Sequence, residues 1–367
     1  AKATEDTFFY RYNCLLAANE VGSEPAAEPS GIAGFHLQMQ RRLRQQPLGM
    51  SSTSTHDTKR GEDARARLYA LSEGVDAWMT ALPRWRLRNS PLVSHRSDGM
   101  VPDLNVEWML YQALLGIIPD HIEADDLPSL QERFCAYALK AVREAKLNTN
   151  WTAPDSDYEK AVQHFARGLV SIDNLDFLTD FADLSRPFVA SGKLNTLVQT
   201  LVKLMAPGVP DFYQGAEGLD FSMVDPDNRR PWKNDEPVAK SAEFVVQSKL
   251  EIIKRGLWMR RQNPVLFEQG AHVPLTVEGA RKDHVLAFAR QAGGELVVVV
   301  APLRLFGVIG ETSLTADPSF WEDTFVRIPA TANSILRDVI SDKTHVCGDV
   351  FVADILTAPV ALLTSTT

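Results

Sequence analysis

The residues best suited to chemistry lie in one short run, Thr53 to Asp63, where an imidazole stands beside a carboxylate. His56 and Asp57 follow small, partly β-branched residues from Met50 to Thr55, which predict a short strand or its end, and a charged helix-forming run comes next. At the carboxyl end of a strand in an α/β fold, loops converge on an open crevice that collects reacting groups. The alternative is structural, because Asp57 could cap the following helix by accepting a backbone N–H.

A second polar group lies downstream, in the loop from Asp225 to Trp232. Two prolines bracket a core that contains Asp227, Asn228 and Arg229. A carboxylate accepts hydrogen bonds and a guanidinium donates them in a fork, so this loop could bind the vicinal hydroxyls of a sugar. The alternative is that the loop is held together by its own Asp–Arg pairs.

Charge is also dense at the start of the chain, where Lys2, Glu5 and Asp6 precede an aromatic, strand-like stretch from Phe8 to Leu16. This group predicts either a solvent-facing turn or the polar rim of a sugar site. The chain opens at Ala1 directly into this stretch, and we expect that more protein once preceded it.

The elements that must position these residues differ in pattern along the chain. Residues 1–57 and 192–262 have the alternation of an α/β fold, with an apolar helix over 192–206, a Pro-Gly breaker and a short buried strand before Gly215. Residues 58–191 are predicted to be an inserted all-helical domain, in which Asp103 or Pro102 starts a helix that Pro119 ends and Asp155 or Ser156 caps another. Apolar residues at helical spacing predict helices over Val106–Ile118, Leu130–Lys146, Asp157–Leu169, Phe177–Ser185 and Ser241–Gln262.

Tryptophans are frequent in the helical stretch, and composition alone favours core packing for Trp78, Trp85, Trp108 and Trp151. Trp151 has an alternative role, because it lies in a polar loop after Arg143 and could stack on a sugar face.

Residues 263–367 are expected to form a carboxyl-terminal all-β domain of sandwich type, since short β segments alternate there with Gly, Asp or Pro turns. The predicted segments are His272–Val277, His284–Arg290, Glu295–Leu303, Phe325–Ile328, Val350–Ala353 and Val360–Leu363.

Composition excludes several classes of function. The chain has 367 residues and a net charge of −9, which argues against a nucleic-acid partner because phosphates require a basic face. Three scattered cysteines, Cys14, Cys135 and Cys347, predict neither a metal site nor a disulfide framework and favour a reducing, cytoplasmic location. No apolar run reaches the ~20 residues that cross a bilayer, so no membrane partner is expected.

Three stretches together resemble the maltooligosyltrehalose synthase family, glucan 1-α-glucosylmutases of the α-amylase superfamily. They are Lys2–Tyr12, Thr53–Arg67 with its His-Asp-Thr-Lys-Arg motif, and Pro210–Gly215 with Asp225–Pro231. The resemblance covers nearly the whole chain and implies the carboxyl-terminal part of the enzyme. It implies an α/β fold in which residues 1–57 and 192–262 form the second half of a (β/α)8 barrel, with 58–191 inserted and 263–367 appended.

The resemblance also implies roles for individual residues. Asp57 is similar to the superfamily's third acidic residue, which binds the 2- and 3-hydroxyls of the sugar in subsite −1 and stabilises the oxocarbenium-like transition state. His56 would contact the same ring. Lys2, Glu5 and Lys59 look like subsite +1 residues, and Arg60, Asp227, Asn228 and Arg229 are further candidates for binding substrate.

The implied reaction converts the reducing-end α-1,4 bond of linear maltooligosaccharides into an α,α-1,1 bond by double displacement, without metal or cofactor. A retaining mechanism needs two carboxyl groups about 5 Å apart. Neither the family's nucleophile motif nor its acid/base motif occurs in the chain, so we expect a separate amino-terminal half to supply both and the chain alone to be inactive. The alternatives are another glucan hydrolase or transglycosylase of the superfamily, and a non-catalytic glucan-binding fragment.

Overall fold

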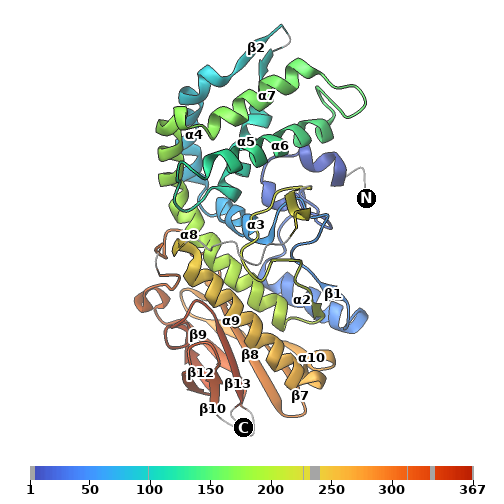
Figure 1. Cartoon of the computed structure of the whole chain (residues 1–367). Coiled ribbons are helices and arrows are strands. Elements are labelled where there is room, and N and C mark those ends of the chain that lie inside the picture. The colour runs from blue at the N-terminus through green and yellow to red at the C-terminus, as the bar shows by residue number, and fades with distance from the viewer. Residues whose placement is uncertain are drawn as a thin grey trace. The chain divides into compact units, whose positions relative to one another are not determined.

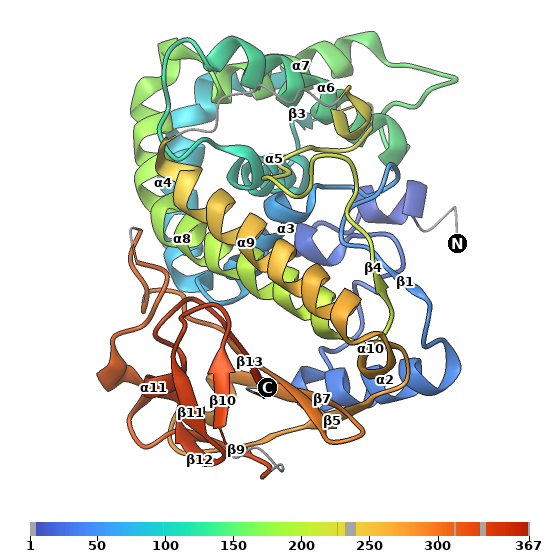
Figure 2. The same cartoon turned by 60° about the horizontal axis from the view of Figure 1, so that its bottom comes forward.

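The computed structural model describes residues 5–97, 99–225, 227–231, 240–311, 313–330 and 335–365. Figure 1 shows its helices and strands, and Figure 2 shows them from a second direction. The chain forms two compact units, each assembled from three stretches of sequence. The first unit comprises Ala1–Ala27, Ser54–Gly192 and Asp220–Glu236, and the second comprises Glu28–Thr53, Lys193–Leu219 and Pro237–Thr367. The predicted domain boundaries after residues 57, 191 and 262 stay predictions.

Helices dominate the first unit, and Figure 1 shows α4, α5, α6 and α7 grouped together. Its main helices are α3 (Glu62–Tyr69), α4 (Val75–Asn89), α5 (Leu104–Ile117), α6 (Leu127–Ala145), α7 (Ser156–Leu169) and the first part of α8 (Leu175–Met205). The other elements are a hairpin of β2 (Ser94–Arg96) and β3 (Gly99–Val101) and the short 3-10 helices η1 (Phe8–Tyr10), η2 (Leu16–Ala18) and η6 (Asp227–Arg229). Among the described residues, no helix is long and apolar enough to cross a membrane.

An aromatic cluster forms the centre of this helical unit. The rings of Trp78 and Trp85 on α4 meet edge to face with their centroids 4.9 Å apart, and Trp85 lies 4.9 Å from Phe181 on α8. Both tryptophans are buried, which confirms the predicted core role for these two. Edge-to-face contacts of this kind add to the free energy gained by burying the rings.

Local signals at helix ends were largely predicted. Asp103 accepts hydrogen bonds from the N–H groups of residues 105 and 106, and Asp155 does the same for α7, so the aspartate is the cap in each of the two predicted pairs of alternatives. Helix α5 ends at Ile117, just before Pro119. The two helices predicted over 177–185 and 192–206 are a single helix, α8, which continues through Pro187. Pro187 has no N–H to donate within the helix, and Phe188 directly after it is fully buried.

Antiparallel sheets dominate the second unit. Six strands pair in the order β11-β10-β13-β8-β7-β5 and three in the order β12-β9-β6. The strands are β5 (Ala271–Pro274), β6 (Thr276–Glu278), β7 (Val285–Ala292), β8 (Glu295–Pro302), β9 (Phe325–Ile328), β10 (Ile335–Asp338), β11 (Thr344–Val346), β12 (Gly348–Phe351) and β13 (Ala361–Ser365). Every predicted β segment overlaps a strand, although the prediction omitted β10 and β11, whose runs are short.

Helices pack beside these sheets. They are α2 (Gly31–Gln45), the end of α8, α9 (Lys240–Gln262), α10 (Pro264–Glu268) and α11 (Val352–Ile355). Both views show α9 running alongside the end of α8, and a Cβ atom built on Gly256 would lie 2.9 Å from Leu204. Helix α2 packs against β5, where His36 Nδ1 lies 3.1 Å from His272 Nε2.

One parallel pair of strands also belongs to the second unit. Strands β1 (Met50–Ser51) and β4 (Val209–Pro210) pair in parallel, with Met50 opposite Val209. Strand β1 is shorter than predicted, because the strand predicted to reach Thr55 ends at Ser51. The prediction that β4 is buried is wrong, since 42% of Val209 is exposed. The strand predicted over Phe8–Leu16 is also wrong, because this segment forms η1 and then a turn leading to η2.

Candidate functional site

The loop from Ser54 to Gly61 in the first unit presents the predicted histidine and aspartate at its tip. Thr58 Oγ1 donates to the carbonyl oxygen of Thr55 at 2.9 Å and accepts the Thr55 N–H at 3.2 Å. Thr55 Oγ1 in turn accepts the N–H of Asp57 at 3.1 Å. These bonds close a tight turn. His56 and Asp57 are both exposed on it.

The carboxylate of Asp57 is open to a ligand. Its side chain is 63% exposed, and one oxygen lies 3.7 Å from Arg229 Nη2. An exposed ion pair of this length contributes at most about 1 kcal/mol, so a ligand could displace it cheaply. Helix α3 begins at Glu62 with Gly61 as its N-cap residue, so the alternative that Asp57 caps this helix is wrong.

Asn228 and Arg229 hold the same turn from the side. Asn228 Nδ2 lies 3.1 Å from each of the carbonyl oxygens of His56 and Thr58, and Arg229 Nε donates to the carbonyl oxygen of His56 at 3.2 Å. The structure therefore brings together two distant motifs, as predicted for parts of one site. It uses the amide of Asn228 to fix the backbone beneath Asp57.

Glu20 fixes the other side of the loop, and sequence reasoning missed it. Its carboxylate accepts the N–H of Lys59 at 2.9 and 3.1 Å and that of Arg60 at 3.3 Å. It also lies 2.8 Å from Arg65 Nη1, with both side chains largely buried. An acid that lies 39 residues before the backbone it holds gives no periodic or spacing signal. Glu20 thus determines where the loop residues after Asp57 lie.

Lys59 points toward Asp6. Its Nζ lies 3.7 Å from Asp6 Oδ1, and its side chain is almost fully buried. Glu5 is half-buried one residue before Asp6. Lys2, the third residue predicted for subsite +1, lies outside the described residues. The structure thus places Lys59 beside the charged stretch, through Asp6.

Arg60 lies inside the helical unit. It is 4% exposed, and it donates to the Tyr137 hydroxyl at 2.8 Å and toward the carbonyl oxygen of Leu16 at 3.4 Å. We assign its guanidinium to supporting the loop, in contrast to the substrate contact expected from the sequence.

Asp227 is bound by two arginines, of which Arg230 belongs to its own loop, as the alternative predicted, and Arg133 belongs to α6. Its carboxylate accepts from Arg133 Nη2 at 2.9 Å, from Arg230 Nη2 at 2.6 Å and from the N–H of Met223. Neighbouring Asp225 pairs with Lys140. Burial raises the pKa of Asp225, but the hydrogen bond and charge of Lys140 outweigh this and lower it below its ordinary value. These carboxylates stiffen the loop that carries Asn228 and Arg229.

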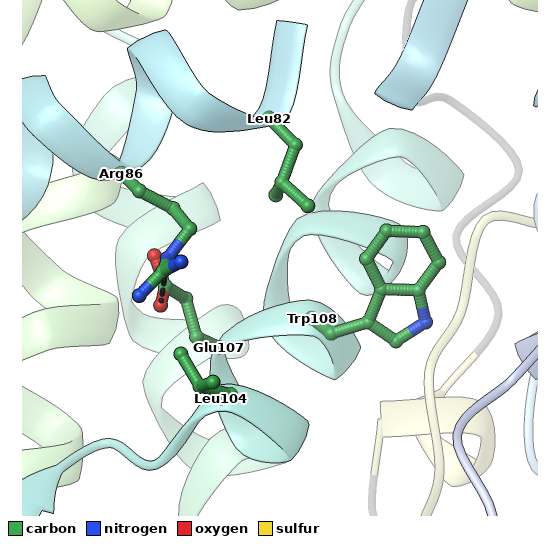
Figure 3. A pocket seen from close by; sticks show the side chains of 5 residues that line it. All are labelled: Leu82, Arg86, Leu104, Glu107 and Trp108. Atoms are coloured by element: carbon green, nitrogen blue, oxygen red, sulfur yellow. Dashed lines mark hydrogen bonds and ion pairs between the residues drawn. The ribbon is translucent and has the colours of Figure 1, made fainter. Parts of the chain in front are cut away.

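A separate pocket lies between α4 and α5, with a volume of about 260 Å³. Figure 3 shows Leu82 and Trp108 on one side and Arg86 pointing toward Glu107 on the other. Arg86 Nε donates to Glu107 at 3.1 Å, and Glu107 also accepts from the Tyr111 hydroxyl at 3.0 Å. None of the residues predicted from the motifs lines this pocket. Across the described ranges, no group of three or more His, Cys, Asp or Glu could hold a metal ion.

The chain is similar to known proteins in sequence and in fold. No protein-family model matches the sequence. The chain is 35% identical over 347 residues to a Mycobacterium tuberculosis (strain H37Rv) protein provisionally named maltooligosyl trehalose synthase, covering 93% of this chain and 43% of that protein.

Solved structures give the same result. Maltooligosyltrehalose synthase from Arthrobacter ramosus superposes with a TM-score of 0.77 at 32% identity, covering 100% of this chain and 45% of that one. A hypothetical maltooligosyl trehalose synthase from Sulfolobus tokodaii gives 0.74 at 28% identity, again with 45% of its length covered. The predicted resemblance is confirmed, and so is a mixed helix-and-sheet fold similar to these enzymes. The chain spans less than half the length of these relatives.

Proposed function

We propose that this chain, a homologue of maltooligosyltrehalose synthases over nearly its whole length, contributes the transition-state-stabilising part of a trehalose-forming transglucosylase. The observation that carries the proposal is the Asp57 carboxylate, which is exposed while the backbone around it is fixed by Asn228, Arg229 and Glu20. A rigid support beneath an open charged group is typical of a site organised before its ligand arrives.

The proposed substrate is a linear α-1,4-linked maltooligosaccharide. Asp57 accepts hydrogen bonds from the 2- and 3-hydroxyls of the sugar in subsite −1, and His56 contacts the same ring. As the bond to the leaving oxygen breaks, positive charge develops on the anomeric carbon and the ring oxygen, and the negative charge of Asp57 stabilises it.

The reaction proceeds by two displacements at one carbon. A carboxylate nucleophile attacks the anomeric carbon, the bond to O4 of the reducing-end glucose breaks, and a general acid protonates that oxygen. The same group then takes the proton from the anomeric hydroxyl of the released glucose, which attacks the glycosyl-enzyme and forms the α,α-1,1 bond. We assign the nucleophile and the acid/base to an amino-terminal half, so this chain alone is inactive.

Transfer competes with hydrolysis, so the released glucose must stay in place. We assign Lys2, Glu5 and Lys59 to subsite +1, where charged groups would grip its hydroxyls. The position of the Lys59 ammonium, 3.7 Å from Asp6 in the charged stretch that includes Glu5, supports grouping these residues in one subsite. Holding the glucose raises its effective concentration far above that of a freely diffusing acceptor.

The proposed architecture is half of a (β/α)8 barrel with a helical insertion and an appended β domain. The parallel pairing of β1 with β4 supports it, since parallel neighbours need a crossover connection and the helical residues 58–191 lie between these strands in sequence.

The test is reconstitution. The chain is co-expressed with the part of the Arthrobacter ramosus enzyme that it does not match, and maltopentaose products are analysed. We expect a non-reducing product, and Asp57→Asn should lower its rate by about 10²–10³-fold. The matched control is Asp157→Asn, because Asp157 is another exposed acid of the same unit.

Three results would contradict the proposal. A rate for Asp57→Asn within twofold of the control excludes the assigned role. An increase in reducing ends indicates a hydrolase. Tight glucan binding without any turnover in the reconstituted enzyme indicates a binding fragment.

A further inference from the structure

Trp151 is the large aromatic residue of a polar loop between α6 and α7, and it is 52% exposed. The sequence favoured core packing for this residue, and that prediction is wrong. Exposing so large a ring forgoes the free energy that its burial would provide. An exposed tryptophan that is also held rigidly therefore suggests recognition of a ligand.

The ring is held from one face and one edge. The Arg143 guanidinium lies over it, with Cζ 4.8 Å from the ring centroid. The indole N–H donates to Glu144 Oε1 at 3.0 Å. Arg143 is itself fixed by two hydrogen bonds to Glu159, at 2.8 and 2.7 Å. Because Arg143 covers one face and half of the residue is exposed, the opposite face is open to solvent.

The loop backbone is equally constrained. Asn150 Oδ1 accepts the N–H groups of Thr152 at 3.0 Å and Ala153 at 2.8 Å. Thr149 Oγ1 donates to Glu159 at 2.6 Å and accepts the N–H of Asp155 at 3.0 Å. The ring therefore loses little conformational entropy when a ligand binds, as expected of a preorganised contact.

A short series of contacts connects this loop to the candidate site. Lys146 Nζ donates to Thr7 Oγ1 at 3.2 Å, and Arg11 Nε donates to the carbonyl oxygen of Ala145 at 2.6 Å. Asp6, next to Thr7, pairs with Lys59. The segment from Asp6 to Arg11 therefore contacts both Lys59 and the chain at the start of the Trp151 loop, within the same unit.

We propose that the open face of Trp151 is a further glucan-binding subsite, which stacks on the apolar C–H face of a glucose unit remote from the bond that reacts. Glu144, whose Oε1 accepts the indole N–H, sets a carboxylate beside the ring that can also accept hydrogen bonds from sugar hydroxyls. The ligand class, an α-1,4-glucan, rests on the proposed function. The polar border favours a sugar over an apolar protein surface.

The experiment measures maltoheptaose binding to the chain alone by calorimetry, so it needs no turnover. Trp151→Ala should weaken binding about fivefold to tenfold, as expected from the loss of one stacking contact. Trp151→Phe keeps an aromatic face and should stay within twofold of the unaltered chain. The matched control is Trp258→Ala on α9, since Trp258 is 62% exposed, and it should leave affinity unchanged. Equal urea midpoints for the variants verify that they fold.

A second readout uses the reconstituted enzyme. Trp151→Ala should raise KM for maltoheptaose and leave kcat unchanged, with a smaller effect for maltotriose, whose short chain does not reach the ring. Affinity for Trp151→Ala equal to that of the unaltered chain, or no glucan binding by the chain, overturns the subsite. Failure of the proposed function would appear instead as absent transfer while calorimetry still detects Trp151-dependent binding.

Discussion

Glu20→Gln should destabilise the first unit and loosen the loop that carries Asp57. The substitution keeps the size of the side chain and one acceptor oxygen, but it removes the charge that lies 2.8 Å from Arg65 Nη1. Both residues are buried, so the guanidinium would lose its acidic partner away from solvent. Removing one partner of a buried ion pair costs about 3–5 kcal/mol, and the weaker hydrogen bond to Lys59 N–H adds to this.

The assay is urea unfolding of the chain, followed by fluorescence. The tryptophans of the first unit, which include the buried pair Trp78 and Trp85, report its unfolding. Glu24→Gln is the matched control, since Glu24 is an exposed acid in the same segment. Adding Arg65→Met to Glu20→Gln should recover much of the lost stability, because no buried guanidinium then remains without an acidic partner.

The reasoning is refuted if Glu20→Gln lowers the free energy of unfolding by less than about 0.5 kcal/mol relative to the control. In the reconstituted enzyme, the same variant should lower transfer activity under conditions where it remains folded, because the backbone that positions Asp57 and Lys59 is released.

Two further outcomes concern the second unit. Burial, then the charges of His36 and Arg290, lowers the pKa of His272 to about 3. Below about pH 6.5 the unfolded chain therefore binds a proton that the folded chain does not, and this residue's contribution to the free energy of unfolding falls by about 2 kcal/mol between pH 7 and pH 5. His272→Gln should make the urea midpoint less sensitive to pH over this window, and an unchanged slope would contradict the assignment. Gly208→Ala should lower stability by about 1–3 kcal/mol, because φ is +116° and an added Cβ would lie 2.6 Å from a backbone carbonyl oxygen. Thermal unfolding should show no such loss for Gly310→Ala, where a Cβ meets no atom within 4 Å.

Much of the fold was predictable because its signals are local. The caps at Asp103 and Asp155 depend on residues two and three positions away, and the strand over 325–328 was predicted with its observed bounds. The continuation of α8 through Pro187 was not predictable in this way, since it depends on packing of the flanking turns. The short strands β10 and β11 owe their formation to neighbours across the sheet.

The candidate site was likewise predictable only where its signals are local. The motif containing Asp57 was recognisable because its residues are adjacent, and its contact with Asn228 was expected only through a resemblance. Glu20 was not predicted because its partners lie 39 and 40 residues further along the chain. The sequence predicted either substrate binding or a structural role for Asp227. Its bonds to Arg133 and Arg230 favour the structural role.

The chain passes back and forth between its two compact units, and this has a consequence for biosynthesis and for dissection. Because the first unit includes Asp220–Glu236, a nascent chain cannot complete it until that late stretch has left the ribosome, although α3 to α7 are made long before. By then the chain has also supplied Glu28–Thr53 and Lys193–Leu219 to the second unit. A single cut after Glu236 would keep every stretch of the first unit on one fragment but would divide the second unit, and a deletion from Pro237 onward would remove only part of the second unit.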